Sequence, residues 1–304
     1  MWTELKNGIG HQHFKALARA ISLVENEAAG YEAFLREIPP GRAAVTGITG
    51  PPGAGKSTLT DALIAEWTGA GKKIGVLCVD PSSPFHLGAL LGDRIRMSEW
   101  YNHPGVFIRS LATRGALGGL HPHILEITAL MQAAGFDHII IETVGVGQSE
   151  IEIAGLADTT VVVLVPEAGD EVQTMKAGLM EIADIFVVNK SDRPDADLFV
   201  KNLRLMLAPV FRQNEWEVPV IKTVASAKTG IHELAEAIEL HQQQQFVSDR
   251  KYRLLAERAY QLIQQERMRS VNKEDLFTAV SNAAADPSFN LFAFIQPYLL
   301  KDHL

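Results

Sequence analysis

Seven short apolar runs, rich in β-branched residues, recur along the chain with helical stretches between them. Most of these runs are apolar on both faces, as parallel strands are when helices cover both sides of their sheet. Strands that alternate with helices form β-α-β units, so the sequence predicts an α/β fold with a doubly wound, mostly parallel sheet. The expected strands span 42–48, 73–80, 105–110, 138–143, 159–166, 183–190 and 218–224.

The two ends of the chain lack this alternation. Residues 1–38 are predicted to form a helical N-terminal extension, because apolar residues recur there at helical spacing: Phe14, Leu17, Ile21 and Val24. A second apolar stripe lies in the charged C-terminal part, at Tyr252, Leu255, Ala259 and Leu262. We therefore expect a central α/β domain over 39–240 and a helical arm over 241–304.

The segment Gly50–Ser57, here called the phosphate loop, matches the pattern G-x-x-x-x-G-K-[ST] between an expected strand and a helical segment. Its glycines allow successive backbone N–H groups to turn toward an anion, and the following helix adds its dipole. Lys56 is predicted to neutralise β- and γ-phosphate oxygens during catalysis, and the Ser57 hydroxyl to bind Mg²⁺. The predicted phosphate ligands are Gly50, Gly53, Ala54, Gly55, Lys56, Ser57 and Thr58.

Two further motifs identify the base as guanine. Residues 189–192 match N-K-x-D, in which the Asp192 carboxylate accepts hydrogen bonds from the guanine N1–H and exocyclic amine. Adenine lacks this donor pair and is rejected, while Asn189 and Lys190 are expected to brace the loops and cover the base. The second motif, S-A-K, reads the guanine O6 with its backbone and comprises Ser226, Ala227 and Lys228. Both motifs follow expected strands, where open α/β sheets bind ligands, so GTP and GDP are the predicted ligands.

The segment E-T-V-G at 142–145 stands where GTPases usually carry D-x-x-G. The Glu142 carboxylate is predicted to hold Mg²⁺, and the Gly145 amide to sense the γ-phosphate; both are predicted catalytic residues. Val146 follows, where Ras-type proteins carry a glutamine that orients the attacking water. The sequence therefore predicts hydrolysis that is slow alone and faster with a partner.

Asp80 and Asp93 are further candidate Mg²⁺ ligands. From the residues alone, Asp80 serves equally well as an ordinary strand-ending turn, and Asp93 as a solvated loop charge. Residues 81–122 are rich in glycine and arginine, and this region is a candidate for a segment that orders on nucleotide binding. Four arginines there could stabilise transition-state charge, and the sequence does not select among Arg94, Arg96, Arg109 and Arg114.

Composition excludes several classes of protein. A net charge of −8 argues against non-specific nucleic-acid binding, which needs a basic surface. One cysteine, Cys78, excludes a disulfide framework, and its place in an apolar run predicts core packing. No stretch approaches the roughly 18 apolar residues of a membrane span, and the N-terminus lacks a signal peptide's apolar region. We expect a soluble, cytoplasmic protein.

The motifs GPPGAGKST, VDPSS, LGDRIRM, ATRGALGGL, ETVGVGQSE, GDEVQTMKAG and NKSD occur in this order. Together they closely resemble the methylmalonyl-CoA mutase-associated GTPases, chaperones of an adenosylcobalamin enzyme within the P-loop GTPases that serve metal and cofactor insertion. The resemblance covers nearly the whole chain. It implies a homodimer joined through the C-terminal helices, in which GTP binding and hydrolysis gate cofactor loading into the mutase and protect it.

The resemblance also carries over roles for particular residues. It places Lys56, Ser57, Asp80, Asp93 and Glu142 on phosphate and metal positions, and the glutamate at 142 is typical of this group. It places a third switch loop, which contacts the partner, on the segment that contains Asp170, Gln173 and Lys176.

Three alternatives remain from the sequence. A metallochaperone would need clustered ligands, and the pairs His11 with His13 and His121 with His123 are more typical of solvated positions. A small-molecule or transport-protein kinase would need an acceptor pocket with a general base, and no separate acceptor domain is evident. A scaffold that does not hydrolyse GTP is disfavoured by the complete loop and metal residues.

Overall fold

The computed structural model describes residues 1–80, 97–113, 120–143, 149–168, 177–207, 216–244, 249–268 and 271–299. The chain forms two compact units, Met1–Lys251 and Tyr252–Leu304. Among the described residues, none of the helices combines the length and the apolar character that crossing a membrane requires.

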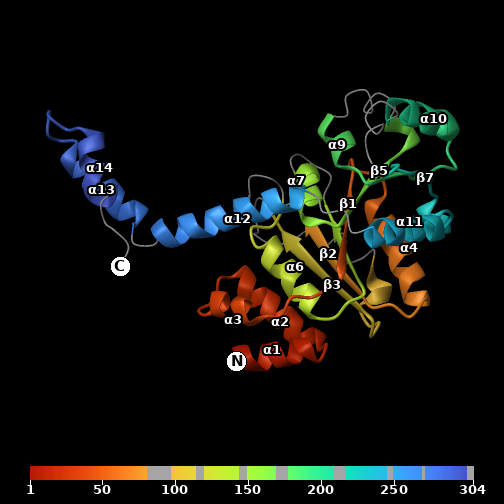
Figure 1. Cartoon of the computed structure of the whole chain (residues 1–304), viewed down its shortest axis with the longest axis horizontal. Coiled ribbons are helices and arrows are strands. Elements are labelled where there is room, and N and C mark those ends of the chain that lie inside the picture. The colour runs from red at the N-terminus through yellow and green to blue at the C-terminus, as the bar shows by residue number, and fades with distance from the viewer. Residues whose placement is uncertain are drawn as a thin grey trace. The chain divides into compact units, whose positions relative to one another are not determined.

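A seven-stranded parallel sheet in the order β3-β2-β4-β1-β5-β6-β7 forms the centre of the first unit (Figure 1). All seven expected strands are present, which confirms the predicted α/β fold. The strands are β1 (Ala44–Thr49), β2 (Ile74–Asp80), β3 (Val106–Ala112), β4 (His138–Glu142), β5 (Thr159–Leu164), β6 (Ile185–Val188) and β7 (Val220–Lys222).

Helices cover both faces of the sheet. One face carries α4 (Lys56–Gly69) and α11 (Ile231–Gln243), and the other carries α6 (Ile124–Ala133), α7 (Ser149–Leu156), α9 (Ala177–Ile182) and α10 (Ala196–Leu207). Strand β5 shows the division, since Val161 and Val163 pack toward α4 and α11 while Val162 and Leu164 pack toward α9 and α10. This alternation is the period of two that a strand imposes on its side chains.

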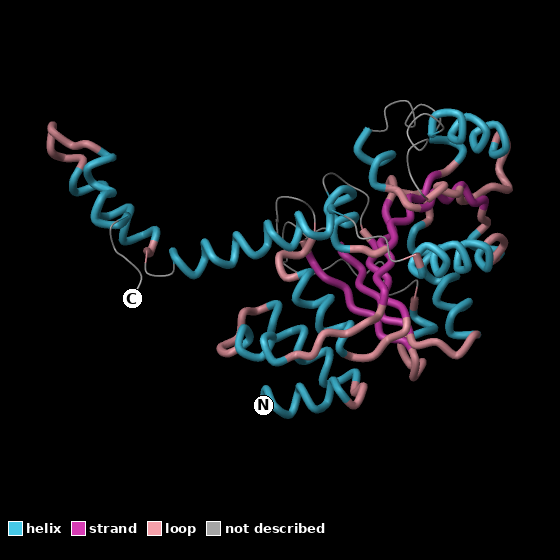
Figure 2. The backbone as a smooth tube through the Cα atoms, in the orientation of Figure 1, coloured by secondary structure: helices cyan, strands magenta, loops and turns pink. Residues whose placement is uncertain are grey.

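The N-terminal extension consists of α1 (Trp2–Gly10), α2 (Phe14–Glu25) and α3 (Tyr31–Glu37), and it packs against α6 (Figure 2). The ring of Phe14 lies 5.6 Å, between centroids, from both Phe107 and Phe136. The stripe predicted from helical spacing is buried at Leu17, Ile21 and Val24.

The extension also buries two histidines that the sequence suggests are solvated, and that interpretation is wrong. His121 is 1% exposed and His123 is 6% exposed. Glu25 and Glu27, at and just after the end of α2, lie against these rings, with His123 Nε2 3.1 Å from Glu27 Oε1. The end of α2 and the residues just after it therefore help to remove these two rings from solvent.

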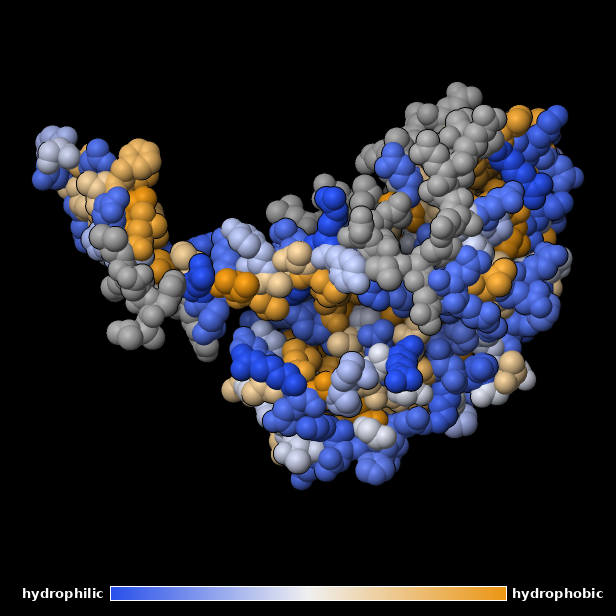
Figure 3. All heavy atoms as spheres, in the orientation of Figure 1, coloured by the Kyte–Doolittle hydropathy of each residue, from blue (hydrophilic) through white to orange (hydrophobic). Residues whose placement is uncertain are grey.

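The second unit contains most of α12 (Asp249–Met268), together with α13 (Lys273–Ala283) and α14 (Leu291–Leu299). The Asn272 side chain caps α13 by accepting hydrogen bonds from the backbone of Glu274 and Asp275. No apolar side chain is buried in the described part of this unit. Figure 3 shows apolar residues on its surface, and the strongly exposed ones include Tyr252, Tyr260, Phe277, Phe292 and Leu299.

Candidate functional site

The phosphate loop joins β1 to α4 at the middle of the sheet. Because β1 lies between β4 and β5, the strand order reverses beside it, and open α/β sheets bind ligands at such a point. Gly50, Gly53 and Gly55 have φ values of +136°, +78° and +90°, which favour glycine. A Cβ at Gly50 would lie 2.1 Å from the Val163 carbonyl oxygen, so at this position glycine is required by space as well as by conformation.

Lys56 begins α4 and is 7% exposed. Its ammonium donates hydrogen bonds to the carbonyl oxygens of Gly50 at 2.8 Å and Pro51 at 3.0 Å. The cation is thus held within the same turn whose amides and helix dipole favour an anion. This placement suits the predicted role of Lys56 at the phosphates.

Ser57 and Glu142 meet at the end of this loop. Strand β4 pairs with β1 so that Glu142 lies opposite Ile48, which brings its carboxylate beside the phosphate loop. Ser57 Oγ donates to Glu142 Oε1 at 2.6 Å, and Thr60 Oγ1 lies 3.0 Å from Glu142 Oε2. Hydroxyl and carboxylate oxygens are ligands that Mg²⁺ prefers, so this donor set fits the predicted ion.

The sequence motif did not identify Thr60, since the pattern G-K-[ST] ends before it. The signal was its position three residues after Ser57, which places both hydroxyls on one face of the helix. Asp80 ends β2, which pairs with β4 so that Cys78 lies opposite Glu142. The backbone of Asp80 therefore reaches the edge of the sheet at which Glu142 lies.

Asn189 connects the phosphate loop to both guanine motifs. It follows β6, is 2% exposed, and donates from Nδ2 to the Ala54 carbonyl at 2.9 Å. Its Oδ1 accepts from Thr223 Oγ1 and from the Ala225 backbone N–H, each at 3.1 Å. One buried amide thus fixes the phosphate loop, the end of β6 and the chain after β7 relative to one another.

Lys190 and its neighbours continue this connection. The Lys190 ammonium donates to the Gly53 carbonyl at 2.7 Å, and the Ser191 N–H donates to Thr223 O at 3.0 Å. Asp192 is exposed, as a side chain that receives a base from solvent needs to be. The S-A-K motif lies in the short helix η3 (Ala225–Ala227) and the turn after it, where Ser226, Ala227 and Lys228 are exposed. The structure therefore brings together the two guanine motifs that are separated in sequence.

Several predicted residues lie outside the described part of the chain: Asp93, Gly145, Asp170, Gln173 and Lys176, together with the side chain of Asp80. Val146, Arg94, Arg96 and Arg114 also lie outside it. Of the four candidate arginines, Arg109 is described. It forms an ion pair with Glu25 and donates to Ser22 Oγ at 3.0 Å, so its guanidinium is bound to the N-terminal extension.

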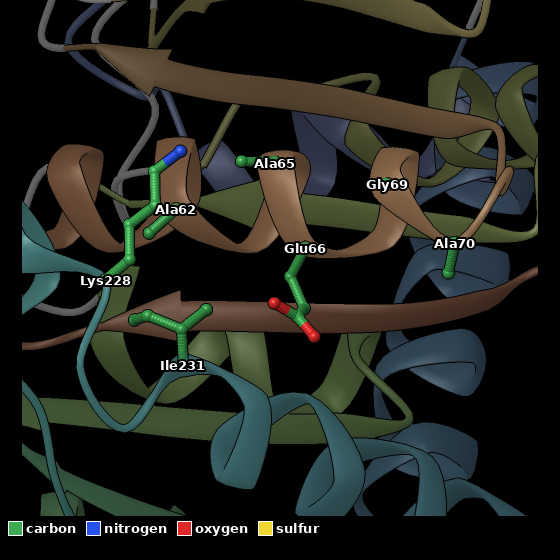
Figure 4. Close-up of a pocket in the computed structure, with 7 residues that line it drawn as sticks. All are labelled: Ala62, Ala65, Glu66, Gly69, Ala70, Lys228 and Ile231. Carbon is green, nitrogen blue, oxygen red and sulfur yellow. The ribbon is translucent and has the colours of Figure 1, made fainter.

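A surface hollow of about 480 Å³ lies beside α4 and the start of α11 (Figure 4). Its lining consists of Ala62, Ala65, Glu66, Gly69, Ala70, Lys228 and Ile231. Lys228 is its one link to the predicted site, and no residue of the phosphate loop lines it. This hollow is therefore distinct from the place where the phosphate and metal residues converge.

Comparison with known proteins identifies the family. A family model described as "Methylmalonyl Co-A mutase-associated GTPase MeaB" matches residues 17–285. The chain belongs to the MeaB family. A protein of Pyrococcus abyssi named as a GTPase is 53% identical over 234 residues, which cover 75% of this MeaB-family chain and 72% of the relative.

Two other similarities agree with this assignment. The mouse protein "Methylmalonic aciduria type A homolog, mitochondrial" is 40% identical over 209 residues, which cover 66% of this chain and 50% of that protein. The crystal structure of a protein described as an LAO/AO transport system kinase matches with a TM-score of 0.68 and 26% identity, covering 94% of this chain and 93% of that one. The MeaB-family protein is a GTPase with the P-loop fold.

Proposed function

We propose that this MeaB-family GTPase serves a methylmalonyl-CoA mutase, and that GTP binding and hydrolysis gate the loading of adenosylcobalamin into the mutase and protect it. The observation that carries the proposal is the family match over residues 17–285, whose description names the mutase. The name of the mouse relative refers to methylmalonic aciduria, which supports an enzyme of methylmalonyl chemistry as the partner. The cofactor-loading role itself rests on the resemblance in motifs.

In this proposal the described loops supply the nucleotide site. Backbone amides of the phosphate loop and the Lys56 ammonium bind the β- and γ-phosphates, and Asp192 reads the guanine edge. Ser57 and Glu142 would hold Mg²⁺, with Asp80 and Asp93 as the further carboxylates. Bound there, the ion supplies positive charge against the phosphate oxygens. Asn189 keeps the base loops and the phosphate loop in register through its three hydrogen bonds.

The proposal assigns control of hydrolysis to the partner. Gly145 would sense the γ-phosphate, and Val146 stands where a water-orienting glutamine is found in Ras-type proteins. The isolated protein is therefore expected to turn over slowly. The switch loop with Asp170, Gln173 and Lys176 would contact the mutase and couple its state to the nucleotide.

We also propose that the protein is a homodimer joined through the C-terminal helices. The described part of the second unit buries no apolar side chain, while Phe277 is 71% and Phe292 is 75% exposed. Side chains of this size are rarely left in water in such number on a monomer. A second copy of the same helices would cover them.

Turnover with and without the partner tests the proposed function. GTP hydrolysis by the full chain in Mg²⁺ is measured alone and with purified methylmalonyl-CoA mutase, and co-elution is followed with GTP, with GDP and without nucleotide. Faster hydrolysis and co-elution in at least one nucleotide state are expected. The Lys56→Ala variant is the control for contaminating hydrolysis. Equal rates and no co-elution in any state would remove the mutase as partner.

The solved structure described as a transport system kinase makes phosphoryl transfer the second candidate. GTP labelled in its γ-phosphate distinguishes the two, because a GTPase releases free phosphate whereas a kinase places the label on an acceptor. A metallochaperone would need clustered metal ligands. The described residues contain no group of three or more His, Cys, Asp or Glu side chains that could hold a metal ion.

A further inference from the structure

Thr60 lies near the start of α4 and is 0% exposed. Its Oγ1 is 3.0 Å from Glu142 Oε2 and also 3.0 Å from the Lys56 carbonyl oxygen. A threonine hydroxyl has one proton to donate. A carboxylate is a stronger acceptor than a peptide carbonyl, so the contact with Glu142 is the one that this proton favours.

Ser57 and Thr60 together hold both oxygens of the Glu142 carboxylate. Ser57 Oγ lies 2.6 Å from Oε1, and Thr60 Oγ1 lies 3.0 Å from Oε2. Because the two hydroxyls project from the same face of one helix, they fix the position of the carboxylate and also its orientation. Glu142 needs such a constraint, since glutamate has one more rotatable bond than the aspartate usual at this position in GTPases.

The two hydroxyls differ in what else they do. Ser57 is a proposed Mg²⁺ ligand, so its oxygen would be shared between the ion and Glu142. Thr60 is one helical turn further along α4 and is not among the proposed metal or phosphate ligands. A bound ion would therefore not compete with Glu142 for the Thr60 hydroxyl.

We propose that Thr60 is a positioning residue for the metal site, which sets the Glu142 carboxylate toward Mg²⁺ without contacting the ion. The inference rests on the proposed Mg²⁺ site at Ser57 and Glu142. Partners that orient metal ligands typically change metal affinity by about 10–100-fold when removed. Loss of the Thr60 hydroxyl is expected to lie at the lower end of this range, because Ser57 still holds one carboxylate oxygen.

Binding of Mn²⁺ to the GDP complex of the full chain, followed by electron paramagnetic resonance, measures the effect without relying on turnover. Thr60→Val keeps the side-chain shape and removes the proton donor, and it is expected to weaken Mn²⁺ binding about tenfold. Thr60→Ser keeps the hydroxyl and is expected to restore binding to within about threefold of the original protein. Thr68→Val is the matched control, since Thr68 lies on the same helix and its hydroxyl bonds only to nearby carbonyls at Ile64 and Ala65 in the described structure.

The result that overturns the inference is Mn²⁺ binding by Thr60→Val as tight as in the original protein. Thr60→Ser binding as weakly as Thr60→Val would also overturn it, because the loss would then follow packing and not the hydroxyl. Should Thr60→Val fail to fold, judged by its circular dichroism, Thr60→Ala takes its place with the same expected results.

Two Glu142 variants separate this inference from the proposal beneath it. Glu142→Gln is expected to weaken Mn²⁺ binding more than Thr60→Val, and unchanged binding there would reject the metal site itself. Weak binding by Glu142→Gln with full binding by Thr60→Val would reject only the role of Thr60. Glu142→Asp draws the carboxylate away from Thr60, so Thr60→Val is expected to have a smaller effect in that background than in the original protein.

Discussion

Replacing Asn189 by alanine removes the amide that joins three loops of the proposed nucleotide site. The change removes the hydrogen-bond partner of the Ala54 carbonyl and of the Ala225 N–H. Both residues are buried, with Ala54 0% and Ala225 5% exposed. The third partner, the Thr223 hydroxyl, can rotate toward another acceptor. Two fixed backbone groups therefore lose their side-chain partner inside the protein.

The expected cost follows from these two groups. A buried polar group left without a partner costs about 1–3 kcal/mol, so the pair predicts a loss of roughly 4 kcal/mol. Total stabilities are about 5–15 kcal/mol, and the variant is therefore expected to fold. For a domain of this size each kcal/mol lowers the Tm by about 2–4 °C, which gives a decrease of roughly 10 °C.

Thermal unfolding without nucleotide, followed by circular dichroism, measures this decrease, and titration with GDP measures the accompanying loss of affinity. Asp192→Ala is the matched control from the same motif. Its side chain is exposed, so it is expected to lower guanine affinity and to leave stability within about 0.5 kcal/mol. A Tm for Asn189→Ala within 2 °C of the original protein would refute the reasoning that this amide ties the loops together.

Two further predictions concern backbone space and pH. Gly50→Ala is expected to be far more destabilising in urea than Gly53→Ala, because a Cβ at Gly50 meets Val163 O at 2.1 Å whereas one at Gly53 meets nothing within 4 Å; equal urea midpoints would contradict this. Burial lowers the pKa of His138 and His241 below 6.5. The folded state then binds fewer protons than the unfolded state, so stability is expected to fall as pH drops below about 6.5 and to be unaffected by these rings above about 7.5. The urea midpoint should be lower at pH 5.5 than at pH 7.5. The variant His138→Phe keeps a ring against Trp67 and should reduce this difference between the two midpoints. An unchanged difference would contradict the assignment of the pH effect to His138.

The sheet was predictable because most of its strands are buried on both faces and appear as continuous apolar runs. The exact ends of the strands were less predictable. The run 159–166 ends as a strand at Leu164, since Pro166 begins the short helix η2 (Pro166–Ala168) and proline cannot donate to a ladder. Another short helix in the central region, η1 (Ser98–Trp100), carries no apolar periodicity that the sequence could reveal.

The site was predictable where one local motif contains it, and not where distant elements complete it. The phosphate loop has its own pattern, but Thr60 acquires its role from Glu142, 82 residues further along the chain. The burial of His121 and His123 is not predictable from the sequence for the same reason. Their neighbours in sequence do not reveal it, and only the packing of α2 places Glu25 and Glu27 against the two rings.

The central claim is that one set of connected loops binds a triphosphate and reads guanine through Asp192. Calorimetric titration of the full chain in Mg²⁺ with GTP and with ATP tests it most directly. GTP is predicted to bind at least about a hundredfold more tightly than ATP, and Asp192→Ala to remove most of that preference. ATP bound as tightly as GTP, or a preference that survives in Asp192→Ala, would contradict the claim.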